Sequence, residues 1–297
     1  MSFRSGFVGV VGRPNVGKST LVNYYVGQKV AIATPMPQTT RHKILGILTR
    51  PEAQIIFVDT PGFHDPQHTL GQYMVKTALG TLDAVDLLLV LIDARRGYLS
   101  DDHRLIQAVA RAKRPAFLVL NKVDLVRPKQ RLLPLIEAAR QFGCFRDFFP
   151  VSSLKGDQMD VLLQHIIPSL PEGPLWFTAP QVTDRSRLFQ MAELIREQVI
   201  RHTFEEVPHA VAVSIEHLEE QPDPQPLVIH ATIVVERETQ KGILIGKGGQ
   251  KLKAIGAQAR LGIEQLVHRH VFLQLWVKVT EDWRRDPHQL RALGYGE

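Results

Sequence analysis

The sequence has little cysteine and no long hydrophobic run, and both absences exclude classes of protein. Cys144 is the only cysteine, so an internal disulfide framework is impossible and a reducing, cytoplasmic environment is expected. The longest apolar run, residues 87–92, has the length of a strand and is far too short to span a bilayer. The first residues carry one arginine but no hydrophobic signal segment, so we expect a chain that is not exported. Internal repeats and low-complexity tracts are also absent.

Charge is distributed unevenly along the 297 residues. Residues 1–175 contain 21 basic and 14 acidic side chains (+7), whereas residues 176–297 contain 15 and 16 (−1). Within the second half, residues 239–260 hold five basic side chains and no acid, while residues 193–223 hold eight acids and two arginines. We therefore expect a polarised second domain whose positive charge surrounds the glycine-rich stretch IGKGGQ.

Residues 1–172 are expected to form one α/β domain. Short apolar runs alternate there with longer amphipathic stretches, which predicts buried strands separated by helices and a mostly parallel sheet covered on both faces. These runs are residues 7–12, 53–59, 86–93, 115–121 and 147–152. Residues 41–50 stand too close to the run at 53–59 for a crossover helix, so we expect one antiparallel edge strand.

Residues 173–184 are expected to link this domain to a second one. The stretch carries Pro174 and Pro180 and has no clear hydrophobic period. Beyond it, residues 185–297 show the order helix, strand, strand, helix, helix, strand. This αββααβ order predicts a small α+β domain with IGKGGQ between its last two helices.

The segment GRPNVGKS, residues 12–19, matches the G-x-x-x-x-G-K-[ST] pattern and stands between an expected strand and an expected helix. Glycines in such a loop let backbone N–H groups close around phosphates. We expect Lys18 to neutralise the β- and γ-phosphate oxygens and the Ser19 hydroxyl to reach a Mg²⁺ ion. The segment therefore predicts a nucleoside triphosphate site.

Two further segments are expected to contact Mg²⁺ and the γ-phosphate. In FVDTPG, the Asp59 carboxylate would hold Mg²⁺ and the Gly62 N–H would meet the γ-phosphate. The loop PQTTRHK offers Thr39 and Thr40, and we expect the Thr40 hydroxyl to reach the metal ion. The alternative is that these threonines simply begin a strand. If Thr40 does bind the ion, the loop orders with the nucleoside triphosphate and is released after hydrolysis.

The segment NKVD, residues 121–124, decides the base. The Asp124 carboxylate can accept hydrogen bonds from N1–H and the 2-amino group of guanine, whereas adenine offers no such pair of donors. Asn121 would support the loop, and the Lys122 stem would lie along the ring. SSLK at 152–155 falls where a last base-contacting loop is expected, although such a sequence is also a common polar turn.

The sequence as a whole resembles the bacterial Era family of GTPases. The likeness covers nearly the entire chain, and the motifs that carry it are GRPNVGKST, PQTTRHKILGI, VDTPGFH, NKVD, VTDRS, VERETQK, IGKGGQKLKAIG, LQLWVKV and the closing LGY. The first four set the GTPase superfamily, and those of the second half indicate Era. The expected contacts to the cofactors GTP, GDP and Mg²⁺ are Gly12, Arg13, Pro14, Asn15, Val16, Gly17, Lys18, Ser19, Thr20, Asp59, Thr60, Pro61, Gly62, Asn121, Lys122, Asp124, Ser152, Ser153 and Leu154, with Ser19, Thr40 and Asp59 as metal ligands.

One catalytic residue of related enzymes is missing. Ras-like GTPases place a water-orienting glutamine after the D-x-x-G glycine, but this chain has Phe63, so slow intrinsic hydrolysis is expected. The resemblance implies that Asn15 holds a K⁺ ion near the transferred phosphate, in place of an arginine finger. The alternative is that Asn15 only shapes the loop. The expected catalytic set is Lys18, Thr40, Gly62 and Asn15.

IGKGGQ lacks the P-loop pattern and is not expected to follow a strand. It supplies a G-x-x-G turn between two helices, which lets backbone approach a sugar-phosphate chain and resembles a KH domain that clamps about four single-stranded nucleotides. Ile243, Ile245 and Leu252 are expected to form a floor for the bases. The expected RNA contacts are Ile245, Gly246, Lys247, Gly248, Gly249, Lys251 and Lys253.

Three functions remain open at this stage. The resemblance implies a monomeric GTPase switch that binds the 3′ end of 16S rRNA and acts in assembly of the 30S subunit and rRNA processing. A second possibility is a passive RNA-binding protein whose nucleotide only stabilises the fold. The third is a signalling or cell-cycle GTPase at the inner-membrane surface, since Era-like proteins are also linked to that membrane, although no lipidation motif is present.

Overall fold

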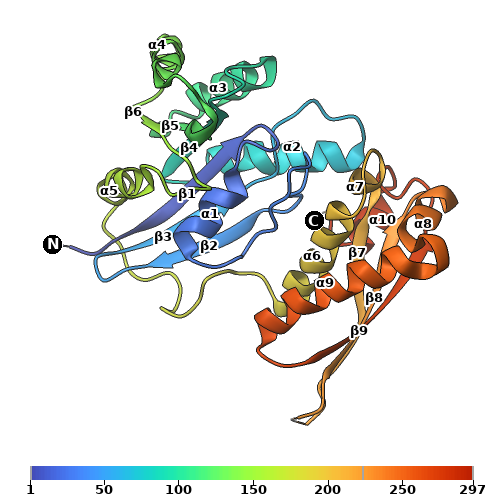
Figure 1. The fold of residues 1–297 in the computed structure, drawn as a ribbon. Helices are drawn as coiled ribbons and strands as arrows, with labels where there is room; N and C mark the ends of the chain where they lie inside the picture. Colours follow the sequence, from blue (N-terminus) through green and yellow to red (C-terminus); the bar gives the residue numbers. More distant parts are fainter. Residues whose placement is uncertain (1, 223, 296–297) are drawn as a thin grey trace. The chain divides into compact units, whose positions relative to one another are not determined.

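The computed structural model describes residues 2–222 and 224–295, and it shows two compact units (Figure 1). Unit 1 contains Met1–Gln67 and Gly71–Asp184, and unit 2 contains His68–Leu70 and Arg185–Glu297. The division along the chain falls between Asp184 and Arg185.

Unit 1 is built on a six-stranded sheet in the order β2-β3-β1-β4-β5-β6. Its strands are β1 (Arg4–Gly12), β2 (Ile44–Thr49), β3 (Ala53–Asp59), β4 (Leu87–Asp93), β5 (Ala116–Asn121) and β6 (Asp147–Pro150). All neighbouring strands pair in parallel except β2, which pairs antiparallel with β3 at the edge. The prediction of a mostly parallel sheet with one antiparallel edge strand is confirmed.

Helices cover both faces of this sheet. They are α1 (Lys18–Val26), α2 (Thr69–Leu82), α3 (Ser100–Ala112), α4 (Leu132–Arg140) and α5 (Met159–Ser169). One apolar core holds α1 and α5 against the sheet, and a second holds α2, α3 and α4 against the opposite face. Every residue of β3, β4 and β5 is buried, which explains why these strands are continuous apolar runs without alternation.

The segment expected to be a linker is bonded to the sheet of unit 1. Ser5 Oγ of β1 donates to the Pro174 carbonyl at 2.7 Å, and Gln54 Oε1 of β3 accepts the N–H groups of Trp176 and Phe177 at 2.7 and 3.0 Å. Farther along, the Ile47 N–H donates to the Val182 carbonyl at 2.9 Å. The proline-rich composition therefore marks an irregular but well-bonded stretch that runs beside β2.

Unit 2 packs helices against a three-stranded sheet in the order β7-β8-β9. Its elements are α6 (Arg187–Arg201), α7 (Val207–Ala210), β7 (Ala212–Glu219), β8 (Leu227–Val235), α8 (Glu238–Ile245), α9 (Gln250–Val267), β9 (Val271–Val279) and α10 (Pro287–Ala292). β7 pairs antiparallel with β8, and β8 pairs in parallel with β9. The αββααβ core is confirmed, with two short helices added.

The extra helix α7 corrects one boundary, because the strand was expected to begin at His209. Pro208 stands in the first turn of α7, where its fixed φ and missing N–H suit a helix start. The strand begins only at Ala212. Alternation along β8 then buries Ile229, Ala231 and Ile233.

Candidate functional site

The phosphate-binding segment is a loop between β1 and α1. Gly17, which precedes α1, has φ 102°, a left-handed conformation that favours glycine. A Cβ atom at this position would stand 2.3 Å from Asn121 Nδ2. The loop can therefore close against the end of β5 because residue 17 has no side chain. The first N–H groups of α1 have no acceptor within the helix and form a natural anion site.

Lys18 is buried beneath this loop. Its Nζ donates hydrogen bonds to the carbonyls of Gly12 at 3.1 Å and Arg13 at 2.9 Å. Burial lowers the pKa of the Lys18 ammonium from 10.5 to about 8, although the Asp59 charge acts in the opposite direction. An anionic ligand at the loop would offset this desolvation, so the site favours a phosphate.

Ser19, Thr40 and Asp59 come together beside Lys18. Ser19 Oγ donates to Asp59 Oδ2 at 2.6 Å and lies 2.8 Å from Thr40 Oγ1. Asp59 Oδ1 is buried and accepts no hydrogen bond from any residue that the structure describes. Burial raises the pKa of the Asp59 carboxyl from 3.8 to about 6, against the opposing effects of Lys18 and Ser19. Two hydroxyls and a carboxylate with a free oxygen fit a hard cation such as Mg²⁺.

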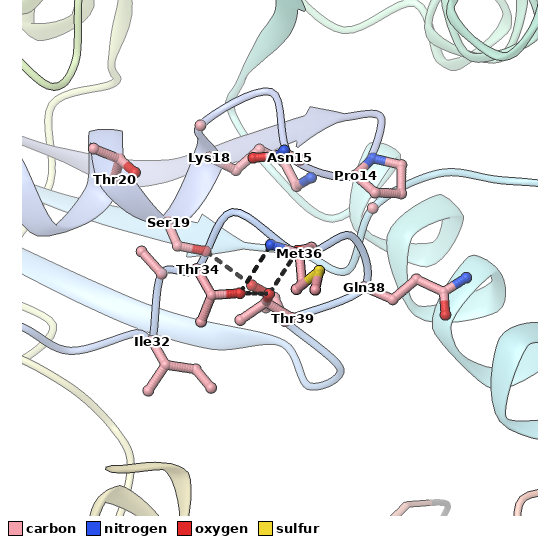
Figure 2. A pocket seen from close by; sticks show the side chains of 14 residues that line it. Pro14, Asn15, Lys18, Ser19, Thr20, Ile32, Thr34, Met36, Gln38 and Thr39 are labelled. Carbon is pink, nitrogen blue, oxygen red and sulfur yellow. Dashed lines mark hydrogen bonds between the residues drawn. The ribbon is translucent and has the colours of Figure 1, made fainter. Parts of the chain in front are cut away.

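The two candidate threonines have different surroundings. Thr39 Oγ1 lies 2.7 Å from Thr34 Oγ1 and donates to the Met36 carbonyl at 2.8 Å, inside its own loop (Figure 2). Thr40 Oγ1, in contrast, lies within hydrogen-bond distance of Ser19 Oγ. The contacts therefore support Thr40 rather than Thr39 as a metal ligand.

The segment after β3 lies against the phosphate loop. Thr60 Oγ1 donates to the Val10 carbonyl at 2.8 Å, and the Phe63 N–H donates to the Gly12 carbonyl at 3.0 Å. Pro61 and Gly62 are buried, and Gly62 lines the same pocket as Lys18. The Phe63 ring is 6% exposed and lies 5.8 Å from the Arg104 guanidinium. It supplies an apolar surface where related enzymes have a polar side chain.

Asn121 joins three loops of unit 1. Its Nδ2 donates to the Val16 carbonyl at 2.8 Å, and its Oδ1 accepts from the backbone N–H and the hydroxyl of Ser153, both at 3.0 Å. Asp124 Oδ1 accepts from the Ser152 hydroxyl at 2.7 Å. The phosphate loop, NKVD and SSLK thus meet at one edge of the sheet.

Lys122 connects the phosphate loop to the end of β4. Its Nζ donates to the Asn15 carbonyl at 2.5 Å and pairs with Asp93 Oδ2 at 2.9 Å. The sequence did not predict Asp93, at the end of β4, as a residue of this site. Its position at the carboxyl end of a parallel strand, where ligand sites form in such sheets, is a signal that could have indicated it. The Asn15 side chain donates to the Pro35 carbonyl at 2.8 Å. Leu154 is 74% exposed, so its side chain makes little contact with this site.

Asp102 is a second residue that the sequence did not predict, and it pairs with Arg13 of the phosphate loop. Arg13 Nε lies 2.6 Å from Asp102 Oδ2, and the same oxygen accepts the Leu99 N–H at 2.9 Å at the start of α3. Arg13 Nη2 and Asp102 Oδ1 are buried and have no hydrogen-bond partner among the described residues. Burial raises the pKa of the Asp102 carboxyl even though Arg13 lies beside it. The acidic residues at 101 and 102 are a sequence signal for the start of α3, but no local pattern in the sequence indicates that Asp102 pairs with Arg13.

The G-x-x-G stretch of unit 2 is an exposed turn between α8 and α9. Gly246, Gly248 and Gly249 all have positive φ angles, from 58° to 77°. Lys247 and Gly248 are exposed, and a Cβ at Gly248 would meet no described atom within 4 Å. Since α9 begins at Gln250, the turn presents backbone and a helix N-terminus to solvent, as a phosphate-binding turn requires.

A groove of about 550 Å³ runs from this turn between α9 and β9. Its walls include Gly249, Leu252, Lys253, Arg260 and the stretch 271–275. Of the three apolar residues expected as a floor, Leu252 lines the groove. Ile243 is instead 46% exposed on α8, and neither it nor Ile245 contributes to the groove wall among the described residues. Lys251 is half-buried and also lies outside the groove wall.

Comparisons with known proteins agree with both units. The family model described as a 50S ribosome-binding GTPase matches residues 7–122, and the KH domain model matches residues 206–284. One similar solved structure is Era in complex with MgGDPNP and nucleotides 1506–1542 of 16S ribosomal RNA, at 42% identity and a TM-score of 0.96, covering 99% of this chain and 100% of that one. An alanine variant of Aquifex aeolicus Era bound to GDP·AlF4⁻ matches at 41% identity and 0.96, with the same coverage.

Fold and site together define a P-loop GTPase domain followed by a KH domain. Given an identity above 40% over the full length, the chain belongs to the Era family of GTPases. None of the helices in the described part of the chain has the length and hydropathy needed to cross a bilayer.

Proposed function

We propose that this member of the Era family is a GTP-hydrolysing switch that binds the 3′ end of 16S rRNA and acts in assembly of the small ribosomal subunit and rRNA processing. The proposed binding of GTP rests on one observation: the side chains of Ser19, Thr40 and Asp59 lie within hydrogen-bond distance of one another beside the buried Lys18. These residues come from three separate segments, each of which has a role in related GTPases: the end of the phosphate loop at the start of α1, the loop before β2 and the end of β3.

The proposed nucleotide lies along the edge where the motif loops meet. Residues 12–20 hold its phosphates, with Lys18 as the buried cation. Residues 59–62 face the γ-phosphate through Asp59 and the Gly62 N–H. Residues 121–124 and 152–154 hold guanine, with Asp124 as the acceptor that selects it over adenine. Asn121 acts through its neighbours, because its side chain ties Val16 to Ser153.

Mg²⁺ fits the cluster on two grounds: all three groups offer oxygen atoms, and Asp59 Oδ1 has no hydrogen bond from the described residues. When bound, the ion would bridge the β- and γ-phosphate oxygens and neutralise charge that develops on them. Thr40 supplies its hydroxyl from the loop before β2. Loss of the γ-phosphate therefore frees this loop, which is the basis of the proposed switch.

Hydrolysis is proposed to depend on Asn15 rather than on a glutamine. Phe63 is buried under Arg104 and cannot orient water. Asn15 Nδ2 donates to the Pro35 carbonyl, and its Oδ1 is the atom that would hold a K⁺ ion near the phosphates. Such an ion would supply the positive charge that an arginine finger supplies elsewhere.

The RNA half rests on the exposed G-x-x-G turn and the groove beside it. Residues 245–249 would contact the sugar-phosphate chain, while Lys253 and Arg260 line the groove and attract phosphate. Lys251 would act from the first turn of α9 through its charge. An Era structure holds a 16S rRNA segment, and we propose the same partner for this chain. The proposed cellular role is therefore in the assembly of the 30S subunit.

We further propose a monomer that works in the cytoplasm and touches the inner membrane only through its surface. Binding to anionic vesicles in the absence of RNA would test the membrane part. A protein that sediments with vesicles but does not bind RNA would contradict the ribosomal role and favour a signalling function.

Two assays test the central proposal. GTP hydrolysis is measured in K⁺ and in Na⁺ at equal ionic strength for the wild type and Asn15→Ala. We expect faster hydrolysis in K⁺ that Asn15→Ala removes, whereas equal wild-type rates would contradict the K⁺ role. RNA affinity is then measured with GDPNP and with GDP. Different affinities support a switch, and equal affinities would indicate a passive RNA-binding protein.

A further inference from the structure

A buried carboxylate at the end of β4 lies next to the NKVD segment, although it belongs to none of the nucleotide motifs. Asp93 is the last residue of β4, and it stands opposite Asn121 in the pairing of β4 with β5. Its side chain is only 4% exposed. Burial of a charged carboxylate is costly unless hydrogen-bond donors surround it, so the donors around Asp93 indicate its role.

The two carboxylate oxygens of Asp93 accept hydrogen bonds from different segments. Oδ1 accepts the Arg95 N–H at 3.0 Å, inside the turn that follows β4. The backbone carbonyl of Asp93 accepts the N–H groups of Arg96 and Gly97, both at 3.0 Å, and closes the same turn. Oδ2 accepts from Lys122 Nζ at 2.9 Å. The strand and the turn therefore fix the carboxylate, and its second oxygen is directed at Lys122.

Lys122 is held at both ends of its side chain. Its backbone has φ 65° and lies directly after β5. At the other end, Nζ donates to the Asn15 carbonyl of the phosphate loop at 2.5 Å as well as to Asp93. The side chain is 22% exposed. Because the ammonium is bound to two separate segments, the carbon stem between it and the backbone has little conformational freedom.

The two acceptors of Lys122 do not contribute equally. The Asn15 carbonyl is neutral, whereas the Asp93 carboxylate forms a charge-assisted hydrogen bond, which is the stronger kind. A free lysine side chain has high rotamer entropy, and its ammonium is strongly hydrated. Asp93 therefore orders Lys122 when the protein folds, so that this entropy is not lost when a nucleotide binds.

We propose that Asp93 is a positioning residue for the guanine nucleotide. It acts through Lys122, whose stem it holds in the conformation that packs along the guanine ring. This proposal rests on the proposed binding of GTP and adds to it a residue outside NKVD. Asp124 selects guanine, while Asp93 sets how firmly the selected nucleotide is held.

The test is a double-mutant cycle in which the GDP affinity of the full chain is measured by equilibrium titration with Mg²⁺ present. Asparagine has the shape of aspartate but one acceptor oxygen, so at position 93 it cannot satisfy both Arg95 and Lys122. Asp93→Asn should lower GDP affinity about 5- to 30-fold, the range expected when a fixed lysine side chain must instead be ordered on binding. Lys122→Met should lower it at least as much.

The decisive comparison is made in the Lys122→Met background. There Asp93→Asn should change GDP affinity by less than about twofold, because no ammonium is left to position. Asp86→Asn is the matched control. Asp86 directly precedes β4 at its opposite end and accepts the Phe7 N–H at 2.8 Å, so its replacement should leave GDP affinity unchanged.

Other outcomes separate this proposal from the proposed function. An equal loss for Asp93→Asn in both backgrounds, including a loss of folding, would show that Asp93 supports the sheet edge rather than Lys122 and would overturn the proposal. Unchanged GDP affinity in Asp93→Asn or in Lys122→Met would overturn it as well. In each case the wild type still binds GDP, so the GTPase function stands. Absence of GDP binding by the wild type would overturn that function, and the role of Asp93 with it.

Discussion

Replacement of Asp102 by alanine should destabilise unit 1 strongly, although Asp102 belongs to none of the nucleotide motifs. Its carboxylate pairs with Arg13 at 2.6 Å and caps α3 through the Leu99 N–H at 2.9 Å. The Asp102 side chain has 0% exposure and that of Arg13 has 8%. Removal of one partner of such a pair costs about 3–5 kcal/mol, because the other charge stays buried without compensation.

The size of the effect can be measured by thermal unfolding of the full chain at fixed GDP and Mg²⁺ concentrations. In a domain of this size, 1 kcal/mol corresponds to about 2–4 °C, so Asp102→Ala should lower the Tm of unit 1 by about 6–20 °C. Asp101→Ala is the matched control, since Asp101 is the adjacent acid and its 3.7 Å contact with Arg104 is partly exposed. It should cost no more than about 1 kcal/mol.

A double variant tests the cause of this loss. Burial raises the pKa of Asp102 despite its partner, so the pair itself adds little net stability, and the cost of a single change comes from the charge left behind. Arg13→Met combined with Asp102→Asn should therefore recover most of the Tm that Asp102→Ala loses. Equal losses for Asp101→Ala and Asp102→Ala, or a double variant no better than the single one, would refute this reasoning.

Three further predictions concern the nucleotide site and its connection to the second unit. Gly17→Ala should weaken GDP binding at least tenfold, because the new Cβ would collide with Asn121. Gly27→Ala is the control, since Gly27 also has a positive φ but open space around it, and it should leave GDP affinity unchanged. Equal GDP affinities of the two variants in an equilibrium titration would contradict this prediction. The gain in GDP affinity on adding Mg²⁺ should decline as the pH falls through about 6, because the Asp59 pKa is raised and a protonated carboxyl binds no metal; a gain that is constant down to pH 5 would contradict it. The same raised pKa means that titration of Asp59 stabilises the metal-free fold below pH 3.8 and that this contribution is lost as the pH rises through about 6. Asp184→Ala removes the acceptor of the Leu45 N–H at 3.0 Å and should reduce the difference in RNA affinity between the GDPNP and GDP forms, with GDP affinity unchanged; an unaltered difference in the anisotropy titration would exclude this contact as a route of coupling.

The sequence predicted what local patterns determine. The strands of unit 1 are continuous apolar runs, so their number and parallel arrangement followed from length and spacing. The motif at residues 12–19 was recognisable because strand, glycines, lysine and serine stand in one segment. Ser19 and Asp59 were expected to share a metal ion, and their side chains do lie 2.6 Å apart.

The remaining features depend on contacts between distant residues. Arg13 and Asp102 pair across 89 positions, and no local signal links them. Prolines at 174 and 180 suggested an interdomain linker, but they did not show that β2 and Gln54 provide hydrogen-bond partners for its backbone. Ile243 was expected in the floor of the groove because it is apolar and near the turn, but the rotation of α8 exposes it.

The most direct test of the account places one negative charge on the G-x-x-G turn and measures both sites in the same preparation. In Gly248→Asp, the new side chain enters open space, and the strain that a φ of 58° imposes on it is confined to the exposed turn, so the fold should be retained. Gly80→Asp adds the same charge at an exposed, open position of α2 and is the matched control. The account predicts that only Gly248→Asp lowers affinity for the 3′ end of 16S rRNA, by at least tenfold, with GDP affinity unchanged in both variants. RNA affinity equal to that of the wild type in Gly248→Asp would contradict the claim that this turn holds the RNA.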